Sequence, residues 1–246
     1  AYKLEVGHPP GAPFFQLFGR IFSLFAAQGT SEVAVAVNIM SALCSSFTIL
    51  FLFWTITAFG KKMFFKKNDK IELGQIIAVL GSGIVGALAY TFSDSFWFSA
   101  VEGEVYAMSS LFTAVTFWCI MKWEEEADKP QASRWLVLIG YLIGLSVGVH
   151  LLSLLTIPAM GMIYYFKKYK YTKTGAIKAF VLSMAILGIV QAVIIPGAIS
   201  LISKFELFFV NTVGLPFNYG TIIYFLAIIA LITYGIIYTK KHNKIV

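Results

Sequence analysis

The stretch WLVLIGYLIGLSVGVHLLSLLTIPAMGMIYYF, residues 135–166, decides the fold. It contains no Asp, Glu, Lys or Arg, and its single histidine, His150, lies at the middle. A membrane-spanning helix needs about 20 apolar residues, so the stretch is too long for one span and short for two. We interpret it as two shortened helices, Trp135–Val149 and Leu151–Phe166, that meet at a tight bend near Gly148-Val149-His150. One long kinked helix is the alternative.

The whole chain has the composition of a protein that is solvated by lipid. Hydrophobic residues make up 59% and charged residues 13% of the 246 residues, and the mean hydropathy is +0.80. Soluble domains average about 25% charged residues. The composition therefore predicts an all-α integral membrane protein, because helices satisfy their own backbone hydrogen bonds within lipid.

Five further apolar runs are long enough to be spanning helices. They are Val33–Phe59, Leu73–Phe92, Val105–Trp123, Ala179–Ile202 and Thr221–Tyr238. Together with the two shortened helices they predict about seven transmembrane helices over residues 33–239, within one transmembrane domain that covers residues 1–246.

The basic residues orient these helices. Sixteen of the 19 lysines and arginines follow the first, third, fifth and seventh runs, on alternate loops, whereas Lys3, Arg20 and Lys204 fall on the other side. The positive-inside rule places the lysine-rich loops in the cytoplasm. A single kinked helix over 135–166 would put the lysines of residues 167–178 outside, so this pattern favours two helices. The net charge of +7 is thereby explained without a nucleic-acid partner.

Residues 1–32 are accordingly expected outside a cell (inner) membrane. Because no signal sequence precedes the first run, we expect at least one further span upstream and interpret the chain as a fragment. Gly7-His8-Pro9-Pro10-Gly11-Ala12-Pro13 is a helix-free loop, since proline fixes φ and restricts the residue before it. The apolar segment Phe14–Ala27 then predicts a helix in the outer interface, with Arg20 reaching toward headgroups. A lead-in helix to the first span is the alternative.

The second outer loop carries carboxylates at the membrane boundary. Glu102 and Glu104 immediately precede the run that starts at Val105. An acidic residue in a first helical turn complements the helix dipole, and this explains one of the two. Ionisable residues at membrane depth are costly and are functional candidates, so we predict a role for Glu104 and, less directly, for Glu102.

Histidines gather on the same predicted face. His150 lies at the expected bend and His8 lies in the first loop. A histidine in an apolar setting either makes a structural hydrogen bond or contacts a phosphate or an acceptor. No metal site is predicted, because the sequence lacks metal-ligand spacing, and Cys44 and Cys119 lie inside apolar runs.

Two glycine patterns lie within the predicted spanning helices. Residues 81–86, GSGIVG, fit a dinucleotide-binding string but lie inside a spanning run without a preceding strand. Gly140, Gly144 and Gly148 repeat every four residues. Both sets predict small-residue faces for close helix packing.

Three segments, taken in order, resemble a known family. They are Leu4–Pro13 (LEVGHPPGAP), Glu104-Val105-Tyr106, and Gly144–Leu151 (GLSVGVHL). The HPPG segment before an interfacial helix resembles the first outer loop of GT-C glycosyltransferases. The set of three resembles a bacterial membrane family of formerly unknown function that is similar to eukaryotic transmembrane protein O-mannosyltransferases.

The resemblance implies a GT-C-like fold and a membrane glycosyltransferase. Such enzymes move a sugar from a polyprenyl-phosphate donor to an acceptor, here a protein hydroxyl, on the extracytoplasmic side. The main catalytic base would be an acidic residue upstream of residue 1. Glu104 and Glu102 would then act on the acceptor, while His8, His150 and Arg20 would bind the donor phosphate. Pro9, Pro10 and Gly11 would shape the loop.

A transporter or a flippase-like lipid handler is the alternative function. Transporters place ionisable residues near the midplane on broken helices. The predicted spans have essentially no charge at their centres, and their polar groups lie at the outer boundary. The pattern therefore favours an enzyme or a flippase-like lipid handler over a transporter. The partners of the enzyme would be membrane lipid, a lipid-linked sugar and a protein acceptor.

Overall fold

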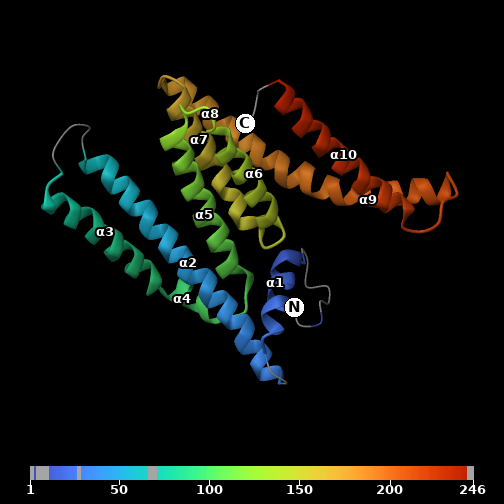
Figure 1. Ribbon diagram of the computed structural model, residues 1–246, viewed down its shortest axis with the longest axis horizontal. Helices are drawn as coiled ribbons and strands as arrows, with labels where there is room; N and C mark the ends of the chain where they lie inside the picture. Colours follow the sequence, from blue (N-terminus) through green and yellow to red (C-terminus); the bar gives the residue numbers. More distant parts are fainter. Residues whose placement is uncertain (1–2, 4–10, 27–28, 66–70, 243–246) are drawn as a thin grey trace. The chain divides into compact units, whose positions relative to one another are not determined.

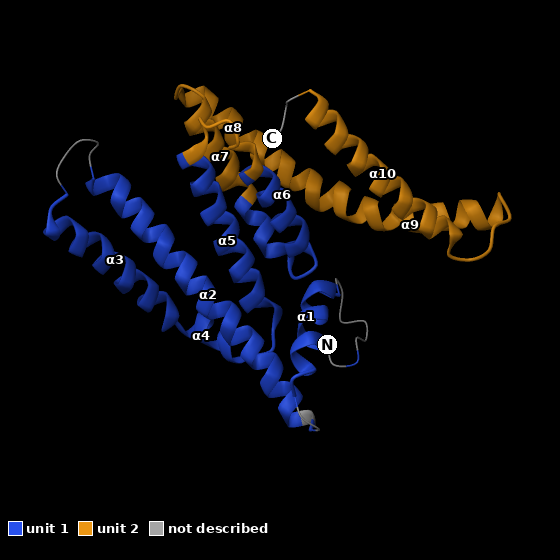
Figure 2. Ribbon diagram, in the orientation of Figure 1, with its two compact units in different colours: residues 1–125, 135–156 blue, residues 126–134, 157–246 orange. Residues whose placement is uncertain are grey.

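A computed structural model describes residue 3 and residues 11–26, 29–65 and 71–242. In this part of the chain every regular element is helical, which confirms the predicted all-α membrane protein (Figure 1). The chain divides into two compact units (Figure 2). Unit 1 comprises residues 1–125 and 135–156, and unit 2 comprises residues 126–134 and 157–246.

The elements follow one another along the chain with short connections. They are α1 (Pro13–Ser23), α2 (Thr30–Phe64), α3 (Leu73–Thr91), α4 (Asp94–Val101), α5 (Val105–Glu126), α6 (Ser133–Val147), the 3₁₀ helix η1 (Leu151–Leu155), α7 (Thr156–Lys168), α8 (Lys173–Ile189), the π-helix η2 (Val190–Ile194), α9 (Ile195–Asn211) and α10 (Tyr219–Lys241).

All seven predicted runs are helical, and five helices of the described chain are long and apolar enough to cross a membrane. These are Ser31–Phe64, Leu73–Thr91, Val105–Glu126, Lys173–Asn211 and Tyr219–Lys241. The first and fourth extend beyond their predicted apolar cores, because helical hydrogen bonding does not stop where hydrophobicity ends. The α6 and α7 helices have 15 and 13 residues. They are the two shortened helices, and that each of them spans the membrane stays a prediction.

The predicted bend is present. Helix α6 ends at Val147, and His150 has the extended angles φ −162° and ψ 142° before η1 begins. Residues 135–166 are therefore not one continuous helix. The break occurs at the glycine and histidine that the sequence indicated.

Unit 1 is built around the long helix α2. Helix α3 lies along it (Figure 1), and a Cβ at Gly83 would be 2.6 Å from Thr57 Cγ2. The predicted small-residue face of residues 81–86 thus allows this close approach. On its other side α2 meets α5 through aromatic rings, with centroids 5.5 Å apart for Phe51 and Trp118.

Unit 2 contains a helix hairpin. The continuous helical segment of α8, η2 and α9 changes to π geometry just before Pro196, which lacks the N–H that a regular helix needs there. Helix α10 packs against α9. The Glu206 carboxylate of α9 accepts hydrogen bonds from the backbone N–H groups of Asn218 (2.6 Å) and Thr221 (2.8 Å) and from Thr221 Oγ1 (3.0 Å). It therefore caps the start of α10.

Substitution of Glu206 is expected to loosen this hairpin. In Glu206→Ala the N–H groups at the start of α10 lose their acceptor, so the variant should unfold at a lower temperature. It should also be cleaved faster by protease within residues 212–218. Lys204→Ala, on the same helix, is the control, and equal behaviour of the two variants would contradict the capping role.

Candidate functional site

The start of α1 is fixed by its own residues. Gly11 has φ of 94°, which glycine adopts without steric strain, and Ala12 follows with φ of 40°. Gln16 Nε2 donates to the Gly11 carbonyl oxygen at 3.1 Å, and this bond holds the end of the first loop against the helix. His8, Pro9 and Pro10 lie outside the described residues.

This helix docks on the bend that follows α6. Phe14 N–H donates to the Gly148 carbonyl oxygen at 2.7 Å. A Cβ at Gly148 would be 2.9 Å from Phe14 Cβ, so only glycine allows the two backbones to approach this closely. A Cβ at Gly140 or at Gly144 would meet no described atom within 4 Å. The predicted packing role of this glycine series therefore rests on Gly148.

We call the contact between α1 and the bend, together with the neighbouring rings, the Gly148 junction (Phe14, Gly148, His150 and Tyr106). A buried cluster of other side chains anchors it. Phe15 of α1 and Val149 of the bend pack with side chains of α2 and α5. Those side chains are Met40, Cys44, Ala107 and Met108. The start of α1, the bend and the start of α5 are thereby held together, although they are far apart in the sequence.

His150 is oriented by two contacts. Its Nδ1 accepts the Leu152 N–H at 3.1 Å and caps η1. Its ring lies 5.3 Å, between centroids, from the ring of Tyr106 on α5. Since Nδ1 acts as an acceptor, a neutral His150 carries its proton on Nε2. The half-buried ring thus has one nitrogen in a structural bond and leaves Nε2–H as a donor for a ligand.

The two acidic residues lie in the connection between α4 and α5. Glu104 directly precedes α5, as predicted, and is two residues before Tyr106. Glu102 ends α4, a short helix that the sequence did not indicate. Between the two, a Cβ at Gly103 would be 3.0 Å from Val37 Cγ1, so this connection lies against α2. Both glutamates are exposed.

Arg20 is placed further along α1. It is six residues beyond Phe14, which corresponds to about 9 Å along a helix axis. Its Nη1 donates to Ser23 Oγ at 3.4 Å, while Ser23 Oγ donates to the Arg20 carbonyl oxygen at 2.6 Å. These contacts place Arg20 near the end of α1.

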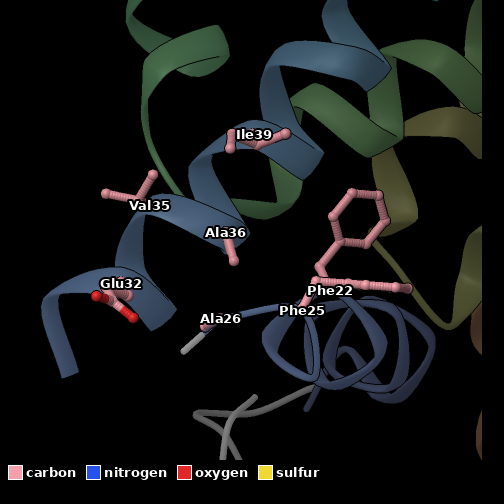
Figure 3. A pocket seen from close by; sticks show the side chains of 7 residues that line it. All are labelled: Phe22, Phe25, Ala26, Glu32, Val35, Ala36 and Ile39. Atoms are coloured by element: carbon pink, nitrogen blue, oxygen red, sulfur yellow. The ribbon is translucent and has the colours of Figure 1, made fainter. Parts of the chain in front are cut away.

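A groove runs between the end of α1 and the first turns of α2 (Figure 3). Its volume is about 440 Å³, and its lining is mostly apolar. The lining residues are Phe22, Phe25, Ala26, Glu32, Val35, Ala36 and Ile39. Phe22 and Phe25 stand on one side, the α2 side chains stand on the other, and the Glu32 carboxylate lies at the end nearest the start of α2.

The sequence did not single out this groove or Glu32. An acidic residue in the first turn of a helix is explained by the helix dipole, so Glu32 gave no separate signal. Predicting the groove also needs the turn after Ser23, which directs α1 back along α2. The available signal in the sequence was the apolar Phe25 near the end of the predicted segment Phe14–Ala27. In the structure Phe25 lies beyond the end of α1 and is 84% exposed.

Fold and site together define a multi-pass, all-α membrane protein in which a short amphipathic helix docks on the bend after α6 and borders an apolar groove. The chain belongs to the family described as "Protein O-mannosyl-transferase TMEM260 N-terminal domain", whose model matches residues 1–173. This range covers α1 to α7. It confirms the resemblance to eukaryotic protein O-mannosyltransferases.

Two curated relatives support the assignment. A Dictyostelium discoideum protein named Protein O-mannosyl-transferase tmem260 is 28% identical over 115 residues, which are 47% of this chain and 12% of that protein. The mouse Protein O-mannosyl-transferase TMEM260 is 24% identical over 147 residues, which are 60% of this chain and 18% of that protein. The chain therefore spans less than a fifth of either relative. No solved structure matches.

Proposed function

We propose that this chain forms the donor-binding part of a membrane glycosyltransferase that transfers mannose from a polyprenyl-phosphate donor to a protein hydroxyl. The transfer would take place on the extracytoplasmic side of the membrane, on a GT-C-like fold. Family membership supports the class of enzyme. The observation that supports our assignment of the site is the docking of α1 on Gly148, next to the contact between the His150 and Tyr106 rings.

The groove between α1 and α2 suits the isoprenoid chain of the donor. Its walls are formed by Phe22, Phe25, Val35 and Ile39, which offer apolar contact to a hydrocarbon chain. Isoprenoid units gain from apolar burial as any hydrocarbon does. A membrane lipid that enters sideways needs such an opening at the level of an interfacial helix.

The donor phosphate needs hydrogen-bond donors. Nε2–H of His150 is one, because Nδ1 is occupied by Leu152 N–H. Arg20 is a second, through a guanidinium that matches phosphate geometry. His8, in the loop that leads to Gly11, is the third in this proposal. Charge-assisted hydrogen bonds of this kind are about twice as strong as neutral ones.

The reaction then needs one proton transfer and one bond exchange. A carboxylate accepts the proton of the acceptor hydroxyl while the hydroxyl oxygen attacks the anomeric carbon of the sugar. The bond from that carbon to the phosphate oxygen breaks in the same step. The polyprenyl phosphate leaves with the bonding electron pair. We assign the main base to an acidic residue upstream of residue 1. Glu104, assisted by Glu102, would hold the acceptor.

Substitution of Glu104 tests the site. In the full-length protein, Glu104→Gln should lower mannosyl transfer by about 10-fold to 100-fold, the range for loss of a charged hydrogen-bonding group. Glu104→Ser removes the carboxylate but supplies a good helix cap before α5. Both variants should therefore lose transfer. Restoration by serine would show that Glu104 only caps α5, and unchanged turnover in both would remove it from the site.

A further inference from the structure

A second pocket lies at the other end of α2, outside the site described above. It has a volume of about 520 Å³ and lies between the last turns of α2 and α5. Glu32 of the apolar groove and Lys61 of this pocket are 29 residues apart, which is about 44 Å along a helix axis. The pocket therefore belongs to the opposite, lysine-rich end of unit 1.

The pocket combines lysines with indole rings. Its lining residues are Trp54, Thr57, Ala58, Lys61, Lys62, Phe65, Trp118, Lys122 and Glu125. Three ammonium groups thus face one carboxylate. The rings of Trp54 and Trp118 lie 5.8 Å apart, and they offer apolar surface together with N–H donors at the depth where a span ends.

The ion pairs among the described residues do not include Lys61. Lys62 pairs with Glu124, and Lys122 Nζ pairs with Glu125 at 2.7 Å while lying 5.6 Å from the centre of the Trp118 ring. Among the described residues, Lys61 Nζ has no carboxylate within 4.0 Å. An anion in the pocket would therefore gain Lys61 as its own partner, with Lys122 already held in place by Glu125.

We infer that this pocket binds the headgroup of an anionic phospholipid. A phosphodiester would accept hydrogen bonds from Lys61 and Lys122, and its acyl chains would follow the apolar surfaces of Trp54 and Trp118 into the bilayer. Basic pockets between transmembrane helices at a cytoplasmic face recognise anionic headgroups in this way. A soluble anion would leave the two indole faces unused, whereas a lipid covers them.

Quenching of tryptophan fluorescence by brominated lipid provides the test. The full-length protein is reconstituted in phosphatidylcholine vesicles that carry a minor fraction of either brominated phosphatidylglycerol or brominated phosphatidylcholine. Phosphatidylglycerol should quench more strongly. Lys61→Gln should lower this relative affinity about fivefold, the value expected for one lysine near an anionic surface. Lys240→Gln, at the end of α10, makes the same charge change outside the pocket and should leave the preference intact.

Two further measurements distinguish binding of the anionic headgroup in the pocket from a change in protein folding and from non-specific lipid contact. Lys61→Arg keeps the positive charge and should keep the preference for phosphatidylglycerol. Quenching by brominated phosphatidylcholine should be the same in all variants, because it reports ordinary lipid contact with a folded protein. Equal quenching of the wild type by both lipids, equal losses in Lys61→Gln and Lys240→Gln, or loss in Lys61→Arg would each overturn the inference.

Discussion

Replacement of Gly148 by leucine should separate α1 from the bend and inactivate the full-length protein. The new side chain starts 2.9 Å from Phe14 Cβ and 3.3 Å from the Leu145 carbonyl oxygen, so α1 must move. The Phe14 N–H then loses its acceptor, Gly148 O. Overpacking and an unsatisfied backbone donor together cost about 2–4 kcal/mol. We expect a lower unfolding temperature and at least about a tenfold loss of transfer.

Gly144→Leu is the matched control for this substitution. It places the same side chain four residues earlier, in the last turn of α6, where a Cβ meets no described atom within 4 Å. Hydrogen exchange of the Phe14 amide should become faster in Gly148→Leu and stay unchanged in Gly144→Leu. If the two variants show the same hydrogen exchange at the Phe14 amide and the same mannosyl transfer, the Gly148 junction does not organise the site.

Substitutions of His150 should distinguish the roles of its two ring nitrogens, Nδ1 and Nε2. In His150→Asn the side-chain oxygen replaces Nδ1 as the acceptor for Leu152 N–H, so η1 stays capped while Nε2–H is lost. In His150→Gln the amide nitrogen takes the place of Nε2 and the cap is weakened. If Nε2–H binds the donor phosphate, His150→Asn should lose about 10-fold to 100-fold in transfer, mainly through KM.

The expected order of activity is wild type, then His150→Gln, then His150→Asn, with His150→Ala the lowest because it lacks both groups. Kinetics at varied donor concentration measure it. If His150→Asn were instead more active than His150→Gln and close to the wild type, with His150→Ala inactive, His150 would only cap η1. The folding of each variant is checked by thermal unfolding, in which His150→Asn should be the nearest to the wild type.

The sequence predicted features that depend on neighbours along the chain. The bend at residues 148–150 follows from the length of the apolar stretch and the position of one histidine. The placement of Glu104 before α5 follows from the start of an apolar run. Both features are local, so hydropathy and charge alternation were sufficient to predict them. The seven-span count remains a prediction, because α6 and α7 are short.

Contacts between distant segments could not be predicted in the same way. The bond from Phe14 to Gly148 joins residues 134 positions apart, and nothing in the glycine repeat distinguishes Gly148 from Gly144. The capping role of Glu206 was not predicted, because its partners Asn218 and Thr221 follow 12 and 15 positions later. The short helix α4 was missed because its eight residues are too few for a recognisable apolar period.

Reconstituted mannosyl transfer tests the central claim most directly. The full-length protein, placed in vesicles, is given polyprenyl-phosphate mannose and a peptide that contains serine and threonine, and mannosylated peptide is measured by mass spectrometry. We predict that mannosylated peptide accumulates with the lipid-linked donor, that a nucleotide-linked mannose does not replace this donor, and that Glu104→Gln and His150→Asn reduce the product. Absence of product with the lipid-linked donor, or equal product from the nucleotide-linked donor alone, would contradict the proposed function.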